Sequence, residues 1–326
     1  MTIFISYFSK EYLLGGLSSI QSAITNNPGS RGLLVCIDQE GEQLLQELSL
    51  SANISIVPFK DLVISKSDYE YFLNSRTKFE ALVSIKPTLL NEISKNFEEG
   101  EYFIYLDTDI HFFESIDEFL RKNSDSSFIV FQHMYMEEPK NYPYGKYNAG
   151  FVVLKKDRHS EEILKEWSRL CSDWCFLRSE HGRYADQGYL DSLVSNPSAL
   201  GALSTSINLG MHYQLNKEKL KREKGKIMIN NESLICFHFH GLRIGNRLIS
   251  TGLNRYGFRF NNFHTYRIIY KPIILRMKSD ARNIKRIKPN ENYYLQPVGF
   301  ENAKGGLRKM IGAAKSLIIK TFIFYF

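Results

Sequence analysis

Short apolar runs alternate with stretches of helical spacing along the first half of this chain. A short apolar run bounded by polar residues predicts a strand that is buried on both faces. The predicted strands span residues 2–7, 32–37, 54–58 and 102–106, and the predicted helices span 11–25, 40–48 and 76–97, the last with a break near Pro87. This alternation predicts βαβ units and a mostly parallel sheet flanked by helices.

The second half of the chain has a more mixed pattern. Apolar runs predict further strands at residues 127–131, 147–154 and 234–239, and helical spacing predicts helices at 161–177 and 186–194. We find no internal repeat and no low-complexity segment. The expected fold class is α/β, with a mixed, mostly parallel sheet.

Two carboxylates, Asp107 and Asp109, follow the fourth predicted strand within the run EYFIYLDTDIHFF at 101–113. Residues i and i+2 of an extended chain point the same way, and ligands of open α/β sheets bind beyond the carboxyl ends of strands. Two carboxylates aimed at one point repel each other unless a cation lies between them, and Mg²⁺ and Mn²⁺ accept oxygen ligands. The pattern indicates a divalent metal site, and the alternative is a turn that only caps the strand.

The composition allows a full core and a reduced interior. With 326 residues, 43% of them apolar, the chain can form one large domain or a domain with an appendage. Its four cysteines are too few for a disulfide framework, and Cys36 and Cys236 lie in apolar runs, where buried thiols are expected. The N-terminus lacks the basic start and the long apolar run of a secretory signal. We therefore expect a cytoplasmic protein.

The net charge of +7 is unevenly distributed. Residues 264–326 carry 13 Lys and Arg against 3 Asp and Glu, whereas residues 1–263 carry 29 against 32. This asymmetry predicts a body at 1–263 and a basic C-terminal extension at 264–326 that meets an anionic surface. Nucleic-acid binding is not expected, because the basic residues lie among aliphatic ones and not on an aromatic platform.

Six segments carry distinctive motifs: SYFSKEYLLGGLSSIQS at 6–22, SIKPTLL at 84–90, YLDTDIHFF at 105–113, GKYNAGFVVLKKD at 145–157, WCFLRSEHGRYADQGYLD at 174–191 and CFHFHGLR at 236–243. With these segments in this order, the chain resembles nucleotide-sugar glycosyltransferases of the GT-A fold. It is most similar to glycosyltransferase family 8 and to bacterial sugar transferases of surface-polysaccharide pathways. The resemblance covers roughly residues 1–245 and implies a GT-A, Rossmann-like sheet.

The resemblance implies three metal ligands. Asp109 would bind the ion, Asp107 would bridge the ion and the ribose, and His238 of the His-x-x-Gly motif that ends at Gly241 would complete the set. Two carboxylates and an imidazole favour Mn²⁺ over Mg²⁺, because imidazole is a softer donor than oxygen. His238 and His240 alternate along the predicted strand, so we expect only one of them to point into the site and favour His238. The alternative is that this histidine is an ordinary core residue.

The resemblance also implies a sugar site. Asp186 would hydrogen-bond the hydroxyls of the donor sugar, and Gln187 would lie near the anomeric carbon. Asp186 could instead, or in addition, cap a helix. Lys86 would reach the diphosphate or the sugar as a point charge, and its alternative is a solvated helix lysine. The segment expected to line the sugar site consists of Asn148, Ala149 and Gly150.

The nucleotide contacts depart in part from the family pattern. The family offers an Asp and an Asn to the base after the first strand, whereas this chain has Ser9 and Glu11 there. The Lys-Pro-Trp that follows the histidine motif is absent, so an arginine would contact the phosphate. Uridine is the expected nucleoside, and another base is the alternative. The expected nucleotide contacts are Tyr7, Tyr12, Gly241 and either Arg243 or Arg247.

The C-terminal extension lies outside the resemblance. Helical spacing at 307–326 places aliphatic residues on one face and Arg308, Lys309, Lys315 and Lys320 on the other. Such a pattern predicts a basic amphipathic helix on the inner face of the cytoplasmic membrane. Lysines interrupt the run well short of the roughly 20 apolar residues that a membrane span needs. The alternative is a helix docked on the body or on a second subunit.

These expectations describe a peripheral, cytoplasmic-face enzyme. It would move a hexose, with galactose or glucose favoured, from a UDP-sugar to a lipid-linked or growing surface glycan with retention of configuration. One alternative is a hydrolase with an Asp-x-Asp nucleophile, which would place that pair on the first strand before Gly-Thr. Another is a non-catalytic nucleotide- or glycan-binding subunit. For Cys171 and Cys175 we expect a helix packing face in preference to a zinc site.

Overall fold

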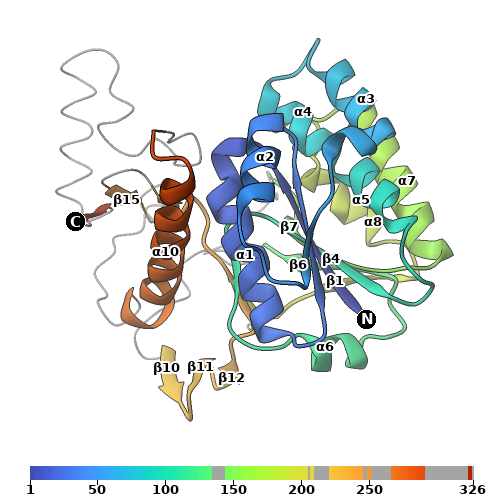
Figure 1. The fold of residues 1–326 in the computed structure, drawn as a ribbon. Coiled ribbons are helices and arrows are strands. Elements are labelled where there is room, and N and C mark those ends of the chain that lie inside the picture. The colour runs from blue at the N-terminus through green and yellow to red at the C-terminus, as the bar shows by residue number, and fades with distance from the viewer. Residues whose placement is uncertain are drawn as a thin grey trace, which may run out of the picture.

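The computed structural model describes residues 1–133, 144–204, 206–208, 220–244, 248–250, 266–290 and 322–324. Within these residues, helices flank a central sheet (Figure 1). The helices are α1 (Leu13–Asn26), α2 (Gln39–Glu47), α3 (Val63–Phe72), α4 (Lys78–Ser84), α5 (Lys86–Ser94), α6 (Asp117–Lys122), α7 (Arg158–Asp173), α8 (Leu190–Leu193) and α10 (Lys271–Ile287). Short helical turns are η1 (Lys10–Tyr12), η2 (Phe59–Asp61), η3 (Gln187–Tyr189) and the π-helix η6 (Tyr266–Tyr270).

The strands of the central sheet are β1 (Thr2–Phe8), β2 (Arg31–Cys36), β3 (Ile54–Ile56), β4 (Tyr102–Leu106), β6 (Phe128–Gln132), β7 (Tyr147–Lys155) and β8 (Ala199–Ala202). Three small sheets contain β5 (Ile110–Phe112), β9 (Ile207–Asn208), β10 (Leu220–Glu223), β11 (Lys226–Ile229), β12 (Glu232–Ser233), β13 (Cys236–His238), β14 (Arg243–Ile244), β15 (Leu248–Ser250) and β16 (Phe322–Phe324).

The central sheet has the order β3-β2-β1-β4-β7-β6-β8. Its first four strands are parallel, β7 runs antiparallel between β4 and β6, and β8 is parallel to β6. This mixed, mostly parallel sheet with helices on its faces confirms the predicted GT-A fold class. Because β1 and β4 are parallel neighbours, their carboxyl ends open at the same edge of the sheet.

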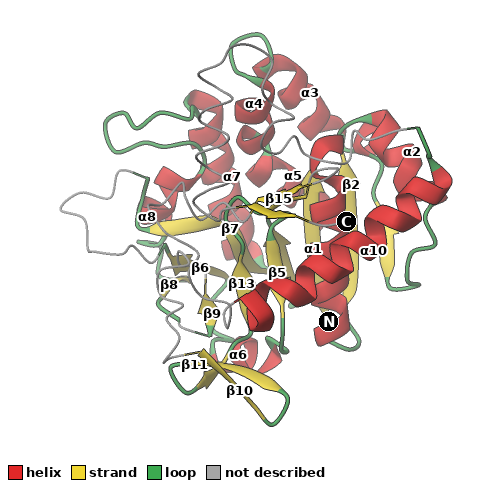
Figure 2. Cartoon of the chain, turned by 90° about the vertical axis from the view of Figure 1, so that its left-hand side faces the viewer, coloured by secondary structure: helices red, strands yellow, loops and turns green. Residues whose placement is uncertain are grey.

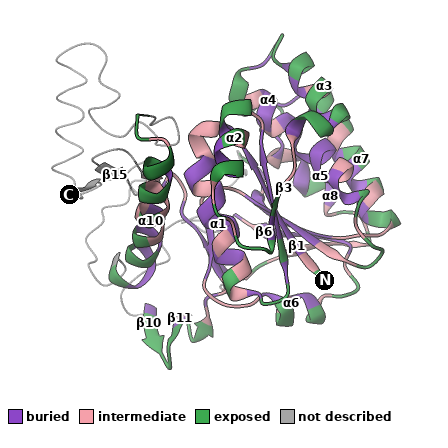
Figure 3. Ribbon diagram, viewed as in Figure 1, coloured by how far each residue is buried: buried purple, intermediate pink, exposed green. Residues whose placement is uncertain are grey.

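Alternate residues of β1 enter two different hydrophobic cores. Phe4 and Phe8 pack in a core with α1, α2 and α10, whereas Ile5 and Tyr7 pack in a core with α3, α4, α5, α7 and α8. Figure 3 shows the central strands mostly buried and the outer sides of the helices exposed. The continuous apolar runs are therefore strands covered on both faces, as predicted. Cys171 and Cys175 lie in the second core, which confirms their predicted packing role.

The predicted break near Pro87 is confirmed, and two helix predictions needed correction only at their ends. The helix expected at 76–97 is α4 followed by α5, and Pro87 lies in the first turn of α5, where its missing N–H removes no helical bond. The helix expected to begin at residue 161 begins at Arg158, because the Asp157 carboxylate accepts the N–H of Ser160 at 2.9 Å and caps it. It ends before Trp174, whose backbone is extended.

Helix α10 brings part of the C-terminal extension onto the body. It packs alongside α1 (Figures 1 and 2). Its apolar face, including Ile273, Ile274 and Ile284, is buried in the same hydrophobic core as α1, whereas Lys285 and Arg286 are exposed. Lys285 and Arg286 are therefore on the solvated side of an amphipathic helix, whereas Arg276 is half-buried.

Most of the helix predicted at 307–326, and Arg247 with it, lies outside the described residues. Of that range, the described Phe322–Phe324 form β16, which pairs antiparallel with β15. The helix prediction is wrong at this end, because adjacent aromatic and β-branched residues suit a strand that finds a partner. No helix in the described parts of the chain has the length and hydrophobicity to cross a bilayer.

Candidate functional site

A cavity of about 890 Å³ opens at the carboxyl ends of β1 and β4. Most of the site residues predicted from the sequence line it, although they come from positions 7 to 243 of the chain. Its size lies within the range of small-molecule sites. The predicted residues that line it are Tyr7, Tyr12, Lys86, Asp107, Asp109, Asn148, Ala149, Gly150, Asp186, Gln187, His238, Gly241 and Arg243.

Asp107 and Asp109 converge through a turn, and not through strand alternation as predicted. Strand β4 ends at Leu106, and the N–H of Ile110 donates to the carbonyl oxygen of Asp107 at 3.2 Å. The Ser6 hydroxyl donates to the Leu106 carbonyl oxygen at 2.9 Å and ties β1 to the end of β4. The convergence itself is confirmed: ligand atoms of Asp107, Asp109 and His238 all lie within 4.8 Å of one another.

His238 reaches this turn because β13 pairs antiparallel with β5, which places His238 opposite Ile110. Its Nε2 lies 2.8 Å from Oδ1 of Asp109. Burial opposes ionisation of Asp109, but the adjacent His238 and the N–H of Gly241 hold the pKa of this carboxyl well below its usual range. Burial disfavours the charged form of His238, yet Asp109 outweighs it and raises the pKa of the imidazole. The two side chains thus form a pair that is partly hidden from solvent.

His240 also lines the cavity, so the prediction that only one of the two histidines faces the site is wrong. Strand β13 ends at His238, and the chain then turns, with the N–H of Leu242 donating to the carbonyl oxygen of Phe239 at 2.7 Å. The alternation of strand side chains does not continue through a turn. The rings of His238 and His240 stack instead, with their centroids 3.6 Å apart.

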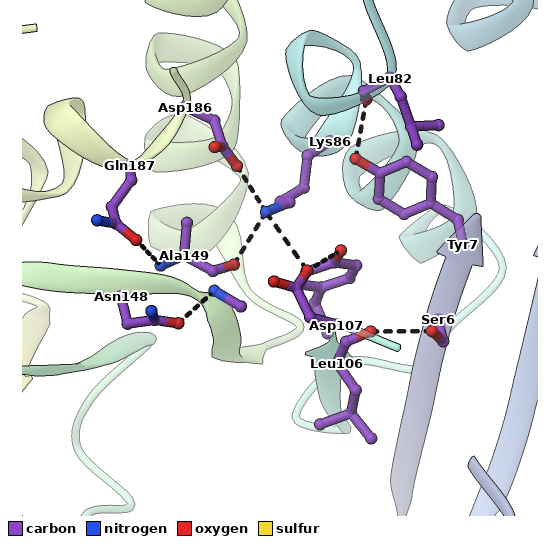
Figure 4. A network of polar contacts seen from close by, with 12 residues as sticks. Ser6, Tyr7, Leu82, Lys86, Leu106, Asp107, Asn148, Ala149, Asp186 and Gln187 are labelled. Atoms are coloured by element: carbon purple, nitrogen blue, oxygen red, sulfur yellow. Dashed lines mark hydrogen bonds and ion pairs between the residues drawn. The ribbon is translucent and has the colours of Figure 1, made fainter. Parts of the chain in front are cut away.

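Lys86 is a buried part of the site and not a solvated lysine, since its side chain is only 4% exposed. Its Nζ lies 2.6 Å from Oδ2 of Asp186, 3.0 Å from the carbonyl oxygen of Ala149 and 4.0 Å from Oδ1 of Asp107 (Figure 4). Burial disfavours the ammonium, but the Asp186 and Asp107 carboxylates outweigh burial and raise the pKa of Lys86. Lys86 therefore links the two carboxylates across the cavity.

Asp186 makes no side-chain cap bond at the start of η3, so its capping role is not borne out. Trp167 holds the backbone of Asp186, because the indole N–H of Trp167 donates to the carbonyl oxygen of Asp186 at 2.9 Å. The preceding Ala185 has φ of 44°, a left-handed conformation that costs a non-glycine residue about 1–2 kcal/mol. The chain enters Asp186 through this backbone conformation, and the Asp186 carboxylate then faces Lys86.

The predicted sugar-site segment is the start of β7, and its polar groups bond across the cavity wall. The Gln187 side-chain oxygen accepts the N–H of Ala149 at 3.2 Å, and its amide donates to the carbonyl oxygen of Tyr144 at 2.6 Å. The Asn148 side-chain oxygen accepts the N–H of Gly150 at 2.7 Å (Figure 4). These bonds fix the backbone that faces the cavity.

Gly150 provides the space in which the three candidate metal ligands meet. A Cβ atom at this position would lie 2.6 Å from Oδ2 of Asp107 and 2.9 Å from Cε1 of His238. The Nδ1 atom of His238 is buried with no hydrogen-bond partner among the described residues. Two carboxylates, an imidazole and this space together fit a divalent ion such as Mn²⁺.

One end of the cavity is formed by the first strand and α4, and Tyr7 there lies beside Tyr105, which contacts Asp107. The Tyr7 hydroxyl donates to the carbonyl oxygen of Leu82 at 2.9 Å, and its ring lies 5.5 Å from that of Tyr105. Tyr12, Glu11 and Arg243 line this end. Aromatic and charged side chains of this kind suit a nucleoside and a phosphate.

Several lining residues were missed by the sequence interpretation. The Tyr105 hydroxyl donates to Oδ1 of Asp107 at 2.5 Å, and strand alternation could have placed it beside Asp107. His133 lies beside Asn148, with Nδ1 3.3 Å from its amide nitrogen. Met277 of α10 also lines the cavity. No sequence signal identifies His133 or Met277, because each enters the site only through tertiary packing.

Comparison with known proteins identifies two curated relatives in Bacillus subtilis (strain 168). The uncharacterized protein YfnD is 24% identical over 267 residues, which cover 79% of this chain and 82% of YfnD. The uncharacterized protein YfnF is 24% identical over 255 residues, which cover 74% of this chain and 82% of YfnF.

Solved structures with a similar fold include the galactosyltransferase LgtC in complex with donor and acceptor sugar analogues. It is 15% identical with a TM-score of 0.43, and the match covers 64% of this chain and 75% of LgtC. Mouse xyloside xylosyltransferase 1 is 14% identical with a TM-score of 0.43, covering 64% of this chain and 87% of that one.

The family model for nucleotide-diphospho-sugar transferases matches residues 30–229. The matched region includes α5, the Asp-x-Asp turn, β7 and Asp186, each of which contributes to the cavity wall. It covers more than half of the chain. The chain therefore belongs to the nucleotide-diphospho-sugar transferase family and is a nucleotide-sugar glycosyltransferase of the GT-A fold.

Proposed function

We propose that this glycosyltransferase is metal-dependent and moves a hexose, galactose or glucose, from a UDP-sugar to a lipid-linked or growing bacterial surface glycan. The observation that carries the proposal is the meeting of Asp107, Asp109 and His238 within 4.8 Å in a cavity that also contains Asp186 and Gln187. The candidate metal ligands and the candidate sugar-binding residues therefore line one cavity.

Asp107, Asp109 and His238 would hold Mn²⁺ or Mg²⁺, with Mn²⁺ favoured by the imidazole. When bound there, the ion would offset the negative charge that develops on the leaving diphosphate without a proton transfer. Gly150 leaves room for the ion, and the N–H of Gly241, 3.3 Å from Oδ2 of Asp109, orients that carboxylate.

The remaining residues of the proposed site bind and orient the donor. Lys86 holds Asp186 at 2.6 Å, so that the free oxygen of this carboxylate can accept hydroxyls of the donor sugar. Gln187 spans Ala149 and Tyr144 and would present its amide near the anomeric carbon. Tyr7, Tyr12 and Arg243 would contact the nucleotide, since they line the same cavity as the candidate metal ligands.

The test is a screen of UDP-hexoses and other nucleotide sugars for Mn²⁺-dependent release of the nucleoside diphosphate. Asp109→Asn should lower this release about a thousandfold or more, because it removes a ligand to the charge-stabilising ion. Asp117→Asn, on the exposed first turn of α6, is the matched control and should keep full activity. Unchanged turnover in Asp109→Asn would refute the proposal, and nucleotide binding with no turnover of any donor would favour the non-catalytic alternative.

Two finer parts of the proposal have their own readouts. Retention predicts that the product carries the anomeric configuration of the donor, which NMR of the product reports. Association of the extension with the inner face of the membrane predicts that deletion of residues 305–326 shifts the protein to the soluble fraction. Because β16 pairs with β15, thermal unfolding must show that the deleted protein is still folded.

A further inference from the structure

His238, at the end of β13, and the residues that follow it contact both the backbone and the side chain of Asp109. The N–H of Phe239 donates to the backbone oxygen of Asp109 at 2.7 Å. On either side of Phe239, His238 contacts Oδ1 of Asp109 at 2.8 Å and the N–H of Gly241 contacts Oδ2 at 3.3 Å. The position of Phe239 therefore fixes how His238 and Gly241 meet the carboxylate.

The side chain of Phe239 is fully buried in the core that α1 and α10 share. Its ring centroid lies 4.8 Å from that of Phe237 and 5.4 Å from that of His111. The ring of Tyr270 is also close, with its centroid 5.1 Å from that of Phe239 and its plane at 87° to it. Phe237 and His111 belong to the two paired strands beside the cavity, whereas Tyr270 comes from the C-terminal extension.

Tyr270 is itself held firmly. It is the last residue of η6, it is fully buried, and α10 begins at the next residue with Pro272 in its first turn. Ile273 and Ile274, which follow it, pack in the same core, and Met277 one turn later reaches the cavity wall. The packed helix α10 therefore anchors the Tyr270 ring, which contacts the Phe239 ring.

We propose that Tyr270 is a positioning residue for the metal site, and this inference depends on the metal dependence proposed above. Its ring holds Phe239 edge-on, and Phe239 in turn holds His238 and Gly241 against Asp109. The segment matched by the family model ends at residue 229, before His238 and before α10. The third ligand and its support are therefore both contributed by the C-terminal part of the chain. Hydrogen-bond partners of metal ligands commonly change metal affinity about ten- to a hundredfold, and Tyr270 acts one layer farther out, through Phe239, so we expect the lower end of this range.

The experiment measures Mn²⁺ binding to the full-length protein without substrate, by the EPR signal of free Mn²⁺, below the unfolding temperature of every variant. Tyr270→Ala should raise the Kd for Mn²⁺ about tenfold. In donor hydrolysis the apparent KM for Mn²⁺ should rise by a similar factor, while kcat at saturating Mn²⁺ is largely retained. A loss of folded protein alone would lower kcat and leave the KM for Mn²⁺ unchanged.

Two controls separate positioning from general stability. Tyr270→Phe keeps the ring and should bind Mn²⁺ as the wild type does. Ile284→Ala removes a fully buried side chain of α10 farther along the helix and should lower the Tm without weakening Mn²⁺ binding. If Tyr270→Ala does not fold, Tyr270→Leu retains apolar volume without the ring and should still weaken binding.

Each outcome decides between the two proposals. Wild-type affinity in Tyr270→Ala or Tyr270→Leu would overturn the positioning role and leave the metal site standing. An equal loss in Ile284→Ala would also overturn it, because any weakening of α10 would then have the same effect. Failure of the wild-type protein to bind Mn²⁺ would overturn both proposals.

Discussion

The two carboxylates of the Asp-x-Asp turn are supported by different parts of the chain. Asp107 is contacted by the Tyr105 hydroxyl at 2.5 Å and faces Lys86 at 4.0 Å, both within the region that the family model matches. Asp109 is contacted by His238 and Gly241, which lie beyond that region.

The two supports also differ in kind. The Asp107 side is a buried polar network on the central sheet, in which Lys86 joins Asp186 and the backbone of β7. The Asp109 side is a three-residue strand and a turn, backed by packed aromatic rings and α10. A buried charge network therefore supports Asp107, whereas the pair of Asp109 with His238 is backed by hydrophobic packing. Substitutions can weaken each half separately.

The largest expected effect on stability is on the Asp107 side. Lys86→Met leaves the buried Asp186 carboxylate without its cation, and breaking a buried pair in this way costs about 3–5 kcal/mol. Urea unfolding at pH 7.5 measures this loss. The matched double variant Lys86→Met/Asp186→Leu should recover most of the stability but none of the activity. A single variant as stable as the wild type would show that this network does not support the fold.

A smaller effect is expected where the two halves meet. Gly150→Ala places a methyl group 2.6 Å from Asp107 and 2.9 Å from His238, so the ligands must move apart. We expect a loss of about 1–3 kcal/mol from overpacking, together with weaker Mn²⁺ binding. Thermal unfolding and Mn²⁺ titration of the same sample test both. Undiminished Mn²⁺ affinity would mean that the three residues do not share one ion.

The smallest effect is expected on α10, behind the Asp109 side. Burial raises the pKa of Asp280 to about 6, although Arg276 opposes this. A carboxyl with a higher pKa in the folded than in the unfolded state contributes stability at low pH and loses it as the pH rises through the folded value.

Asp280→Asn should therefore stabilise the protein by about 1 kcal/mol at pH 7.5 and by much less at pH 4. The difference in unfolding free energy between the two pH values is the measurement. A gain of the same size at both pH values would contradict the role of Asp280 ionisation. Mn²⁺ affinity should not change, because Asp280 lies farther along α10 than Tyr270 and is not part of the proposed support for Phe239.

The sequence predicted the Asp107 side well and the Asp109 side only in part. The apolar run before Asp107 predicted β4, and parallel neighbours predicted where its end would open. His238 was implied by a motif, but His240 was assigned to the wrong face because the end of β13 is set by a turn that hydrophobic spacing does not show. Burial of Lys86 depends on how α5 meets β7, and spacing within α5 contains no such information.

The role of α10 was beyond sequence reasoning for a physical reason. A basic helix with one apolar face has the same pattern whether that face meets lipid or a protein core. We predicted such a helix at residues 307–326 and none at 271–287, although the residues at 271–287 have the same pattern and form α10. In the structure the apolar face of α10 packs against α1, and this contact joins segments that are far apart along the chain.

The distribution of ligands along the chain has a consequence for synthesis. Asp107 and Asp109 leave the ribosome long before His238, and the helix behind His238 follows later still. Until residues 236–287 have been made, a nascent chain has neither the residue that pairs with Asp109 nor the helix that completes the core around Phe239, so we expect the cavity to be finished only after α10 has been synthesised.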